Sequence, residues 1–204
     1  MPPEDRFVCR FAAEPPQEGA PYGRWAETLR EEFLAAVAAI DAGEDDLGEP
    51  GELAWHPDRT WSGRTFVPVT APTSTGLELF GYVSYAPGDA SSEPSEFFAS
   101  ADYTDETAER NPDWRLDLCD EVVGGWRGEG GNVAAMTLVW GRPMVAEGTI
   151  ATAELAGLAV DQCAVVDGRF TLLAPDDYRG DFLDIKLFDR KGNQIASESL
   201  YDEE

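Results

Sequence analysis

The residues best suited to chemistry in this chain surround its one histidine, His56. The imidazole lies in the segment Trp55-His56-Pro57-Asp58-Arg59-Thr60-Trp61-Ser62, which also supplies a carboxylate, a guanidinium and hydroxyls. An imidazole titrates near neutral pH and a carboxylate can orient it, so these side chains are the right types for acid–base or nucleophilic catalysis. Catalytic triads, however, assemble from segments that are distant in sequence, and Pro57 between two tryptophans is typical of a turn with packed aromatic rings.

We therefore predict no catalytic residue, and we expect this segment to be a structural or ligand-contacting loop. The ligand-binding candidates are His56, Asp58, Arg59, Trp55 and Trp61. The alternative function that they support is a small-ligand-binding protein or a hydrolase with a pocket near His56.

No motif in the sequence predicts a metal or a cofactor. The segment 41–52 carries six carboxylates, but an EF-hand alignment that starts at Asp41 puts Gly43 at the third ligand position and Asp46 at the glycine bend. One histidine cannot form a zinc site that needs two. The glycine-rich stretch 124–131 matches neither GxGxxG nor the Walker pattern, and the three cysteines are far apart. We expect 41–52 to be a solvated acidic loop.

The chain is strongly acidic. Its 204 residues include 40 Asp and Glu against 15 Lys and Arg, which gives a formal net charge of -25 at pH 7. Such a field repels nucleic-acid phosphates and anionic lipid headgroups, so we expect neither nucleic acid nor membrane as a partner. Two explanations are compatible with this charge: a solubilising surface, or a face that attracts a basic protein.

The carboxylates are most concentrated between residues 89 and 121, where eleven acidic residues accompany two basic ones. We predict that this segment, with help from 41–52, meets a basic protein partner. The same physical logic operates in immunity proteins that neutralise toxins and in regulators that mimic nucleic acid. The candidate residues of this face are Asp102, Asp105, Glu106, Glu109, Asp113, Asp117, Asp120 and Glu121.

Hydrophobic periodicity predicts one helix near the start of the chain. Between residues 24 and 40, apolar side chains recur every three or four residues, and Gly43 can close the helix in the left-handed conformation. Alternating residues then predict strands over 64–71 and 77–85, joined by a turn-forming segment into a hairpin. Pro68 suggests that the first of these strands lies at a sheet edge.

More strands are expected along the rest of the chain. The dipeptide Asp167-Gly168 and the segment 189–193 mark two hairpin turns. The run 113–123 suits either a strand or a short helix, and 152–161 suits a helical turn or more strand. The remaining predicted strands cover residues 6–11, 97–104, 132–140, 144–151, 163–166, 169–173, 182–188 and 194–200.

These elements predict a mainly β protein, an antiparallel β-sandwich or open barrel with one N-terminal amphipathic α-helix packed against it. We expect a single domain over residues 1–204, with an alternative subdivision into 1–130 and an antiparallel β meander over 131–204. The first residues lack the pattern of a signal peptide, and no window is apolar enough to span a membrane. The combined prediction is an acidic, cytoplasmic, non-catalytic binding protein.

Overall fold

A computed structural model describes residues 25–88, 93–128 and 131–201, and it contains one helix and three antiparallel sheets. The predicted strand 6–11, with Cys9, lies outside the described residues. The elements are α1 (Trp25–Val37), β1 (Ala54–Trp55), β2 (Arg59–Trp61), β3 (Arg64–Pro72), β4 (Glu78–Ala86), β5 (Ser95–Thr104), β6 (Leu116–Arg127), β7 (Val133–Pro143), β8 (Ile150–Leu155), β9 (Leu158–Ala164), β10 (Phe170–Asp176), β11 (Leu183–Phe188) and β12 (Gln194–Ser199). The predicted mainly β class is confirmed.

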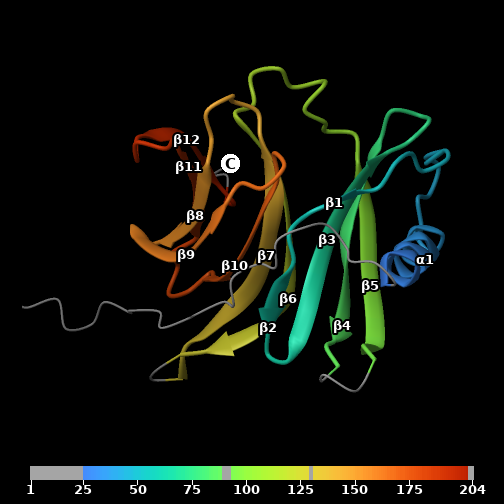
Figure 1. Ribbon diagram of the computed structural model, residues 1–204, viewed down its shortest axis with the longest axis horizontal. Helices are drawn as coiled ribbons and strands as arrows, with labels where there is room; N and C mark the ends of the chain where they lie inside the picture. Colours follow the sequence, from blue (N-terminus) through green and yellow to red (C-terminus); the bar gives the residue numbers. More distant parts are fainter. Residues whose placement is uncertain (1–24, 89–92, 129–130, 202–204) are drawn as a thin grey trace, which may run out of the picture.

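The sheets stack in layers. The helix-side sheet has the order β1-β3-β4-β5, with β2 also paired to β3; the middle sheet is β10-β7-β6; the C-terminal sheet is β12-β11-β8-β9. From right to left, Figure 1 shows α1, the helix-side sheet, the middle sheet and the C-terminal sheet. A separate hydrophobic cluster fills each of the three spaces between these layers. The sandwich arrangement is thereby confirmed, and none of the three described sheets closes on itself.

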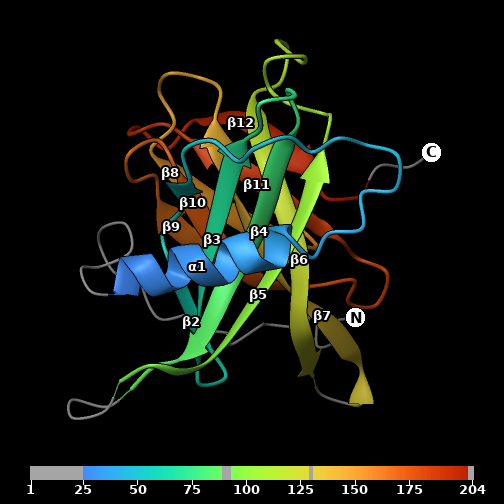
Figure 2. The same ribbon diagram turned by 90° about the vertical axis from the view of Figure 1, so that its right-hand side faces the viewer.

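The helix covers one face of the helix-side sheet. Leu29, Phe33 and Val37 recur every fourth residue and are buried, as the predicted apolar stripe requires. Figure 2 shows α1 lying across the strands β3, β4 and β5. The ring of Phe33 meets Trp55 of β1 edge-on, with 6.4 Å between the ring centroids. Within the described ranges, no helix combines the length and the apolar character needed to cross a bilayer.

The central strand of the molecule is β7, which is buried on both faces. Met136, Leu138 and Trp140 pack toward the helix-side sheet, whereas Val139 packs toward the C-terminal sheet. This two-sided burial explains why the run 132–140 is almost continuously apolar rather than alternating. The pairing of β7 with β6 spans residue 130, where the sequence suggests a subdivision.

The sequence predicts the positions of the turns correctly, but it does not predict every pair of neighbouring strands. The hairpins β3–β4 and β11–β12 form as predicted. Asp167 and Gly168 adopt φ values of 49° and 72°, as a tight turn requires. Val166 and Arg169 exchange backbone hydrogen bonds of 2.8 and 2.9 Å across this turn, so the tight turn closes as predicted. Beyond this bridge, however, β9 pairs with β8 and β10 pairs with β7, so the turn joins two sheets. Local residues specify the turn, but burial across the layers decides the partner strand.

One predicted strand differs from the structure, and both segments with two alternatives are strands. The strand β7 continues to Pro143, and β8 begins only at Ile150, so 144–151 is not one strand. The segment 152–161 is strand on both sides of a turn at Ala156, whose φ is 52°. The ambiguous run 113–123 belongs largely to β6.

Pro68 does not mark an edge, because β3 is paired on both sides. The carbonyl of Pro68 accepts a hydrogen bond from the His56 amide at 2.9 Å, so the backbone of Pro68 faces the irregular junction between β1 and β2. A proline is tolerated there because regular strand pairing, which would require its missing N–H, is interrupted.

Candidate functional site

The segment that contains His56 is largely buried. His56 is 2% exposed, and neither of its ring nitrogens has a side-chain hydrogen-bond partner in the described part of the chain. Burial, together with the nearby charges of Arg169 and Arg142, lowers the pKa of His56 to about 3, and a backbone hydrogen bond at Phe170 opposes only part of this shift. The imidazole is therefore neutral at physiological pH. Asp58 is also buried but does not hydrogen-bond to it, so these two side chains do not form an acid–base pair.

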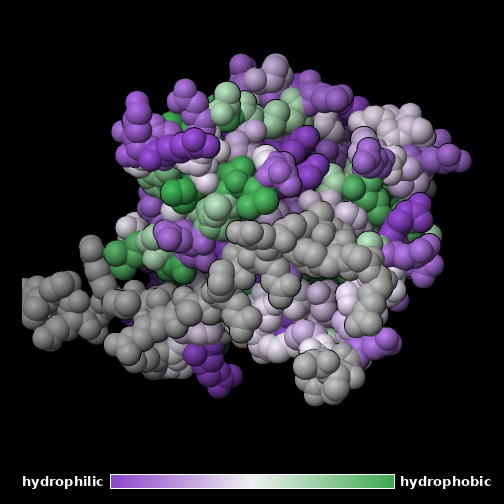
Figure 3. Space-filling view, in the orientation of Figure 1, coloured by the Kyte–Doolittle hydropathy of each residue, from purple (hydrophilic) through white to green (hydrophobic). Residues whose placement is uncertain are grey.

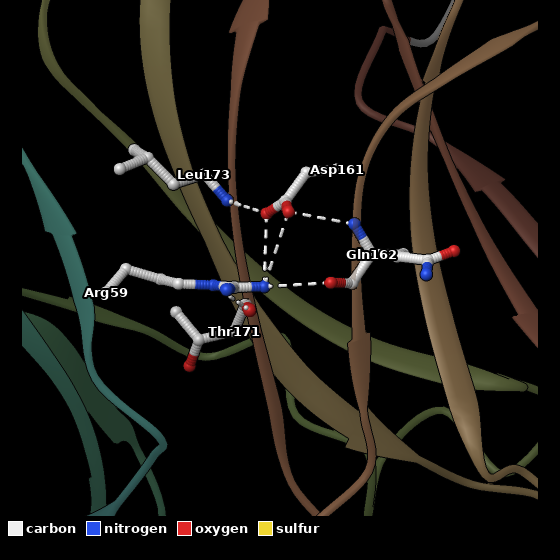
Figure 4. Close-up of polar contacts among 5 residues, drawn as sticks. All are labelled: Arg59, Asp161, Gln162, Thr171 and Leu173. Atoms are coloured by element: carbon white, nitrogen blue, oxygen red, sulfur yellow. Dashed lines mark hydrogen bonds and ion pairs between the residues drawn. The ribbon is translucent and has the colours of Figure 1, made fainter. Parts of the chain in front are cut away.

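Arg59 joins all three sheets through a buried ion pair. Its Nη2 lies 3.2 Å from Oδ2 of Asp161 in β9, and its Nε donates a 2.9 Å hydrogen bond to the carbonyl of Thr171 in β10. Figure 4 shows these contacts together with the Nη2 bond to the carbonyl of Gln162. The carboxylate of Asp161 also accepts the backbone N–H groups of Gln162 and Leu173. This ion pair is consequently almost fully hydrogen-bonded.

The tryptophans on either side of His56 do not form a pair. Trp55 packs in the cluster between α1 and the helix-side sheet. Trp61 packs on the opposite face, between the helix-side and middle sheets, and its ring fills the space beside Gly124 of β6. Gly124 and its neighbour Gly125 lie within strand β6, so this part of the glycine-rich stretch is not a loop. Ligand binding by His56, Asp58, Arg59, Trp55 and Trp61 stays a prediction.

A pocket of about 430 Å³ opens near the end of the space between the helix-side and middle sheets. Alternation along β1 places Ala54, which lines the pocket, and His56 on the same face of the helix-side sheet. Figure 1 shows the connection between β5 and β6, which contributes Thr107, Ala108 and Glu109, crossing over the top of this region. The other lining residues are Thr70, Pro72, Thr73, Gly76, Leu77, Glu78, Arg142 and Met144.

The charged groups at this pocket interact with one another. Arg142 and Asp117 are directly opposite in the β6–β7 pair, and Nε of Arg142 donates a 2.9 Å hydrogen bond to Oδ2 of Asp117, which Nη2 also contacts. Asp117, predicted to belong to the open acidic face, is therefore buried and paired. Burial raises the pKa of Glu78, and the carboxylates of Asp117 and Glu109 raise it further, whereas Arg142 opposes the shift.

Sequence reasoning missed Glu78 and Arg142. A signal for Glu78 exists in the alternation of β4, because Glu78, Phe80 and Tyr82 share one face and the two aromatic residues pack in the core. Because Glu78 continues the face on which Phe80 and Tyr82 pack, alternation alone places its carboxylate between two layers. Arg142 falls between the predicted strands 132–140 and 144–151, whereas in the structure it lies within β7.

Cys119 lies near this pocket in β6, but its thiol is not activated. Burial raises its pKa well above the usual value, and the carboxylates of Glu78 and Asp117 act in the same direction. A thiolate is the nucleophilic form of cysteine, so this environment keeps Cys119 unreactive.

Carboxylates from three segments meet around the edge strand β5. Oγ of Ser100 donates a 2.7 Å hydrogen bond to Glu121 of β6, and the hydroxyl of Tyr103 donates one of 2.8 Å to Asp45 of the 41–52 loop.

The bond to Asp45, with the negative charges of Asp45, Asp102 and Asp41, raises the pKa of Tyr103. Burial raises the pKa of Glu121, as do the charges of Asp102 and Asp120. We refer to Asp41, Asp45, Asp102, Asp120 and Glu121 as the acidic edge.

The other predicted members of the acidic face lie in or beside the connection between β5 and β6. Asp105, Glu106, Glu109 and Asp113 are exposed, and Arg110 pairs with Asp105 at 3.2 Å. In Figure 3, hydrophilic side chains cover much of the upper rim of the molecule, and the hydrophobic ones form small, separate patches. No three His, Cys, Asp or Glu side chains in the described ranges converge in a way that would hold a metal ion.

This chain matches no protein-family model, no curated protein and no solved structure. No relative therefore assigns a role to the pocket or to the acidic edge.

Proposed function

We propose that this protein is a non-catalytic, cytoplasmic binding protein whose acidic edge engages a basic protein partner. The observation that carries the proposal is the meeting of three acidic segments at β5, through the hydrogen bonds of Ser100 to Glu121 and Tyr103 to Asp45. These bonds hold Asp45 and Glu121, which are 76 positions apart, at the same strand, and this supports the proposal of one charged region.

Among the described residues, no ion pair involves a carboxylate of the acidic edge. A basic partner would supply the missing positive charge. Opposite potentials also steer the encounter of two proteins and raise association rates by about 10- to 10³-fold.

The test is capture of partners from a lysate of the source organism at stepped ionic strength. We expect a stoichiometric basic protein to bind at low salt and to elute as the Debye length falls toward ~8 Å at 0.15 M. Its affinity is then measured for a triple variant of exposed members of the acidic edge, Asp41→Asn, Asp102→Asn and Asp120→Asn. The matched control removes three exposed charges elsewhere, by Glu147→Gln, Asp177→Asn and Glu198→Gln.

The comparison of the two triple variants is decisive because both lose three negative charges. We expect the first variant to weaken binding at least about tenfold. The control should change the affinity much less, because salt screens its exposed charges, which lie away from the acidic edge. Equal effects of the two variants would mean that only the net charge matters. A complex that resists high salt would contradict the proposal.

The second candidate, a small-ligand-binding protein or hydrolase with a site near His56, is favoured by the pocket beside Ala54. Its test is a ligand screen followed by His56→Asn. Loss of ligand binding or turnover with an unchanged melting temperature would favour this function. A lowered melting temperature with no change in binding would identify His56 as structural.

A further inference from the structure

We propose that the pocket between the helix-side and middle sheets receives the side chain of a lysine or arginine from the partner protein, with Glu78 and Glu109 as its anionic contacts. This inference rests on the proposed function and specifies where the partner would insert a residue. It names a small site of defined chemistry within a broad charged surface.

The size and the walls of the pocket fit such a side chain. Its volume is about 430 Å³, and Pro72, Leu77, Ala108 and Met144 contribute apolar surface to its lining. Long basic side chains bury their methylene stems against apolar surface while the charged group finds polar partners. A pocket with apolar walls and carboxylates in its lining satisfies both parts of such a residue.

The charge balance of the pocket favours a cation. The positive charge of Arg142 is already engaged, because its Nε and Nη2 both contact the buried carboxylate of Asp117. In the described part of the chain, neither Glu78 nor Glu109 forms an ion pair or a side-chain hydrogen bond. The uncompensated charge at the pocket is therefore negative. An anionic ligand would compete with Asp117 for Arg142 and would be repelled by the unpaired carboxylates of Glu78 and Glu109.

His56 is not among the residues that line the pocket. The charge of Arg142 lowers the pKa of His56, a backbone hydrogen bond at Phe170 opposes this shift, and no side chain of the described residues bonds to its ring nitrogens. His56 lies one inward-facing position beyond Ala54, which lines the pocket. A neutral imidazole can accept a hydrogen bond from a cationic donor, but it cannot provide a counter-charge. The carboxylates of Glu78 and Glu109 therefore supply the charge of the site, and His56 contributes none.

The probes for the test are Nα-acetyl-arginine methylamide and Nα-acetyl-lysine methylamide, with Nα-acetyl-citrulline methylamide as the neutral analogue of arginine. Each is titrated into the full-length ¹⁵N-labelled protein and followed by amide chemical shifts. We expect saturable shifts at Leu77, Thr107 and Ala108 with a cationic probe and none with citrulline. The pH series should show weaker binding as pH falls, because protonation of Glu78 removes its charge.

Two variants identify the contacts. Glu78→Gln keeps the shape of the side chain, and Glu109→Gln changes an exposed residue, so the second variant remains informative if the first is unstable. We expect each to weaken binding of the cationic probe, and Glu78→Gln to do so at least about tenfold, since it removes a charge-assisted hydrogen bond. Glu106→Gln, exposed on the same connection but outside the pocket lining, should change the affinity less than about twofold.

The outcomes separate this proposal from the function on which it rests. Equal binding of citrulline, or unchanged affinity in both pocket variants, would overturn the pocket proposal. If the captured basic partner loses affinity with the acidic triple variant but not with Glu78→Gln or Glu109→Gln, the pocket proposal is wrong and the proposed function stands. If a cationic probe binds but no basic protein does, the assignment to a partner side chain is wrong.

Discussion

Two buried polar residues in neighbouring positions of the chain, His56 and Arg59, have opposite environments. The guanidinium of Arg59 is almost fully hydrogen-bonded and ion-paired, whereas the imidazole of His56 has no side-chain hydrogen-bond partner in the described part of the chain. A buried charge is tolerated only with partners, but a buried imidazole can stay neutral. The two residues should therefore respond differently to substitution and to pH.

Replacing His56 with phenylalanine should remove a specific acid sensitivity. Because the pKa of His56 is about 3 in the folded protein and 6.5 for an ordinary histidine, the unfolded chain binds the proton first as pH falls. Stability is therefore lost below about pH 6.5, by roughly tenfold in the folding equilibrium per pH unit, until the folded-state pKa is reached. Urea unfolding of the wild type and of His56→Phe at pH 7, 6 and 5 measures this difference. A stability difference that is independent of pH would contradict it.

Replacing Arg59 with methionine should strongly destabilise the fold, because it leaves Asp161 buried without its cation. We expect a loss of about 3–5 kcal/mol in the free energy of unfolding. The double variant Arg59→Met and Asp161→Leu should recover part of this loss, since it removes both charges. Arg110→Met, which breaks an exposed ion pair, serves as the control and should cost less than about 1 kcal/mol. A small effect of Arg59→Met would contradict the role of the pair in joining the sheets.

At the scale of the elements, the β6–β7 pair carries both halves of the candidate site. It positions Arg142 opposite Asp117 at the pocket, and it places Glu121 against Ser100 of β5. Close backbone approach at Gly141, which is paired with Leu118, makes this arrangement possible. An added Cβ at Gly141 would lie 2.1 Å from the carbonyl oxygen of Asp117.

The variant Gly141→Ala should therefore move β6 away from β7 or distort both strands. We expect a loss of roughly 1–3 kcal/mol in the free energy of unfolding, as for other overpacked interior positions. Gly125→Ala is the matched control in the same strand pair, because a Cβ there meets nothing within 4 Å. Chemical denaturation of both variants tests this expectation. Equal stabilities would show that β6 accommodates the added methyl group.

In the molecule as a whole, hydrophobic packing between the layers stabilises the fold, whereas the net negative charge destabilises it. Three hydrophobic clusters hold four layers together, while a net charge of -25 makes the folded chain repel itself. The repulsion is strongest where carboxylates gather, as they do at the acidic edge. Compact folding is consequently more sensitive to ionic strength than it is in a neutral protein of this size.

Salt should raise the melting temperature of the free protein. As ionic strength increases from 0.01 to 0.15 M, the Debye length falls from ~30 to ~8 Å, so repulsion between distant carboxylates is screened. Calorimetry in NaCl and in KCl at equal ionic strength separates this screening from binding of a specific cation. A melting temperature that falls with either salt would indicate that attractive surface pairs dominate instead.

The local features of this fold could be read from the sequence. The spacing of Leu29, Phe33 and Val37 predicts the buried face of α1, and Asp167-Gly168 predicts a tight turn. Such features depend on residues that are neighbours along the chain, so periodicity and turn chemistry are sufficient. The net charge likewise follows from composition, and it predicts which classes of partner are repelled.

The tertiary structure decided which distant residues meet. It paired β10 with β7 rather than β9, buried Asp117 against Arg142, and brought Glu78 to a pocket that no motif indicates. It also placed Asp45 beside Tyr103 across 58 positions of sequence. These contacts depend on how the sheets stack, because each strand can satisfy its hydrogen bonds with more than one neighbour. Burial of both faces of β7 selects one pairing of the strands. This selection depends on residues from several segments, so no single segment of the sequence encodes it.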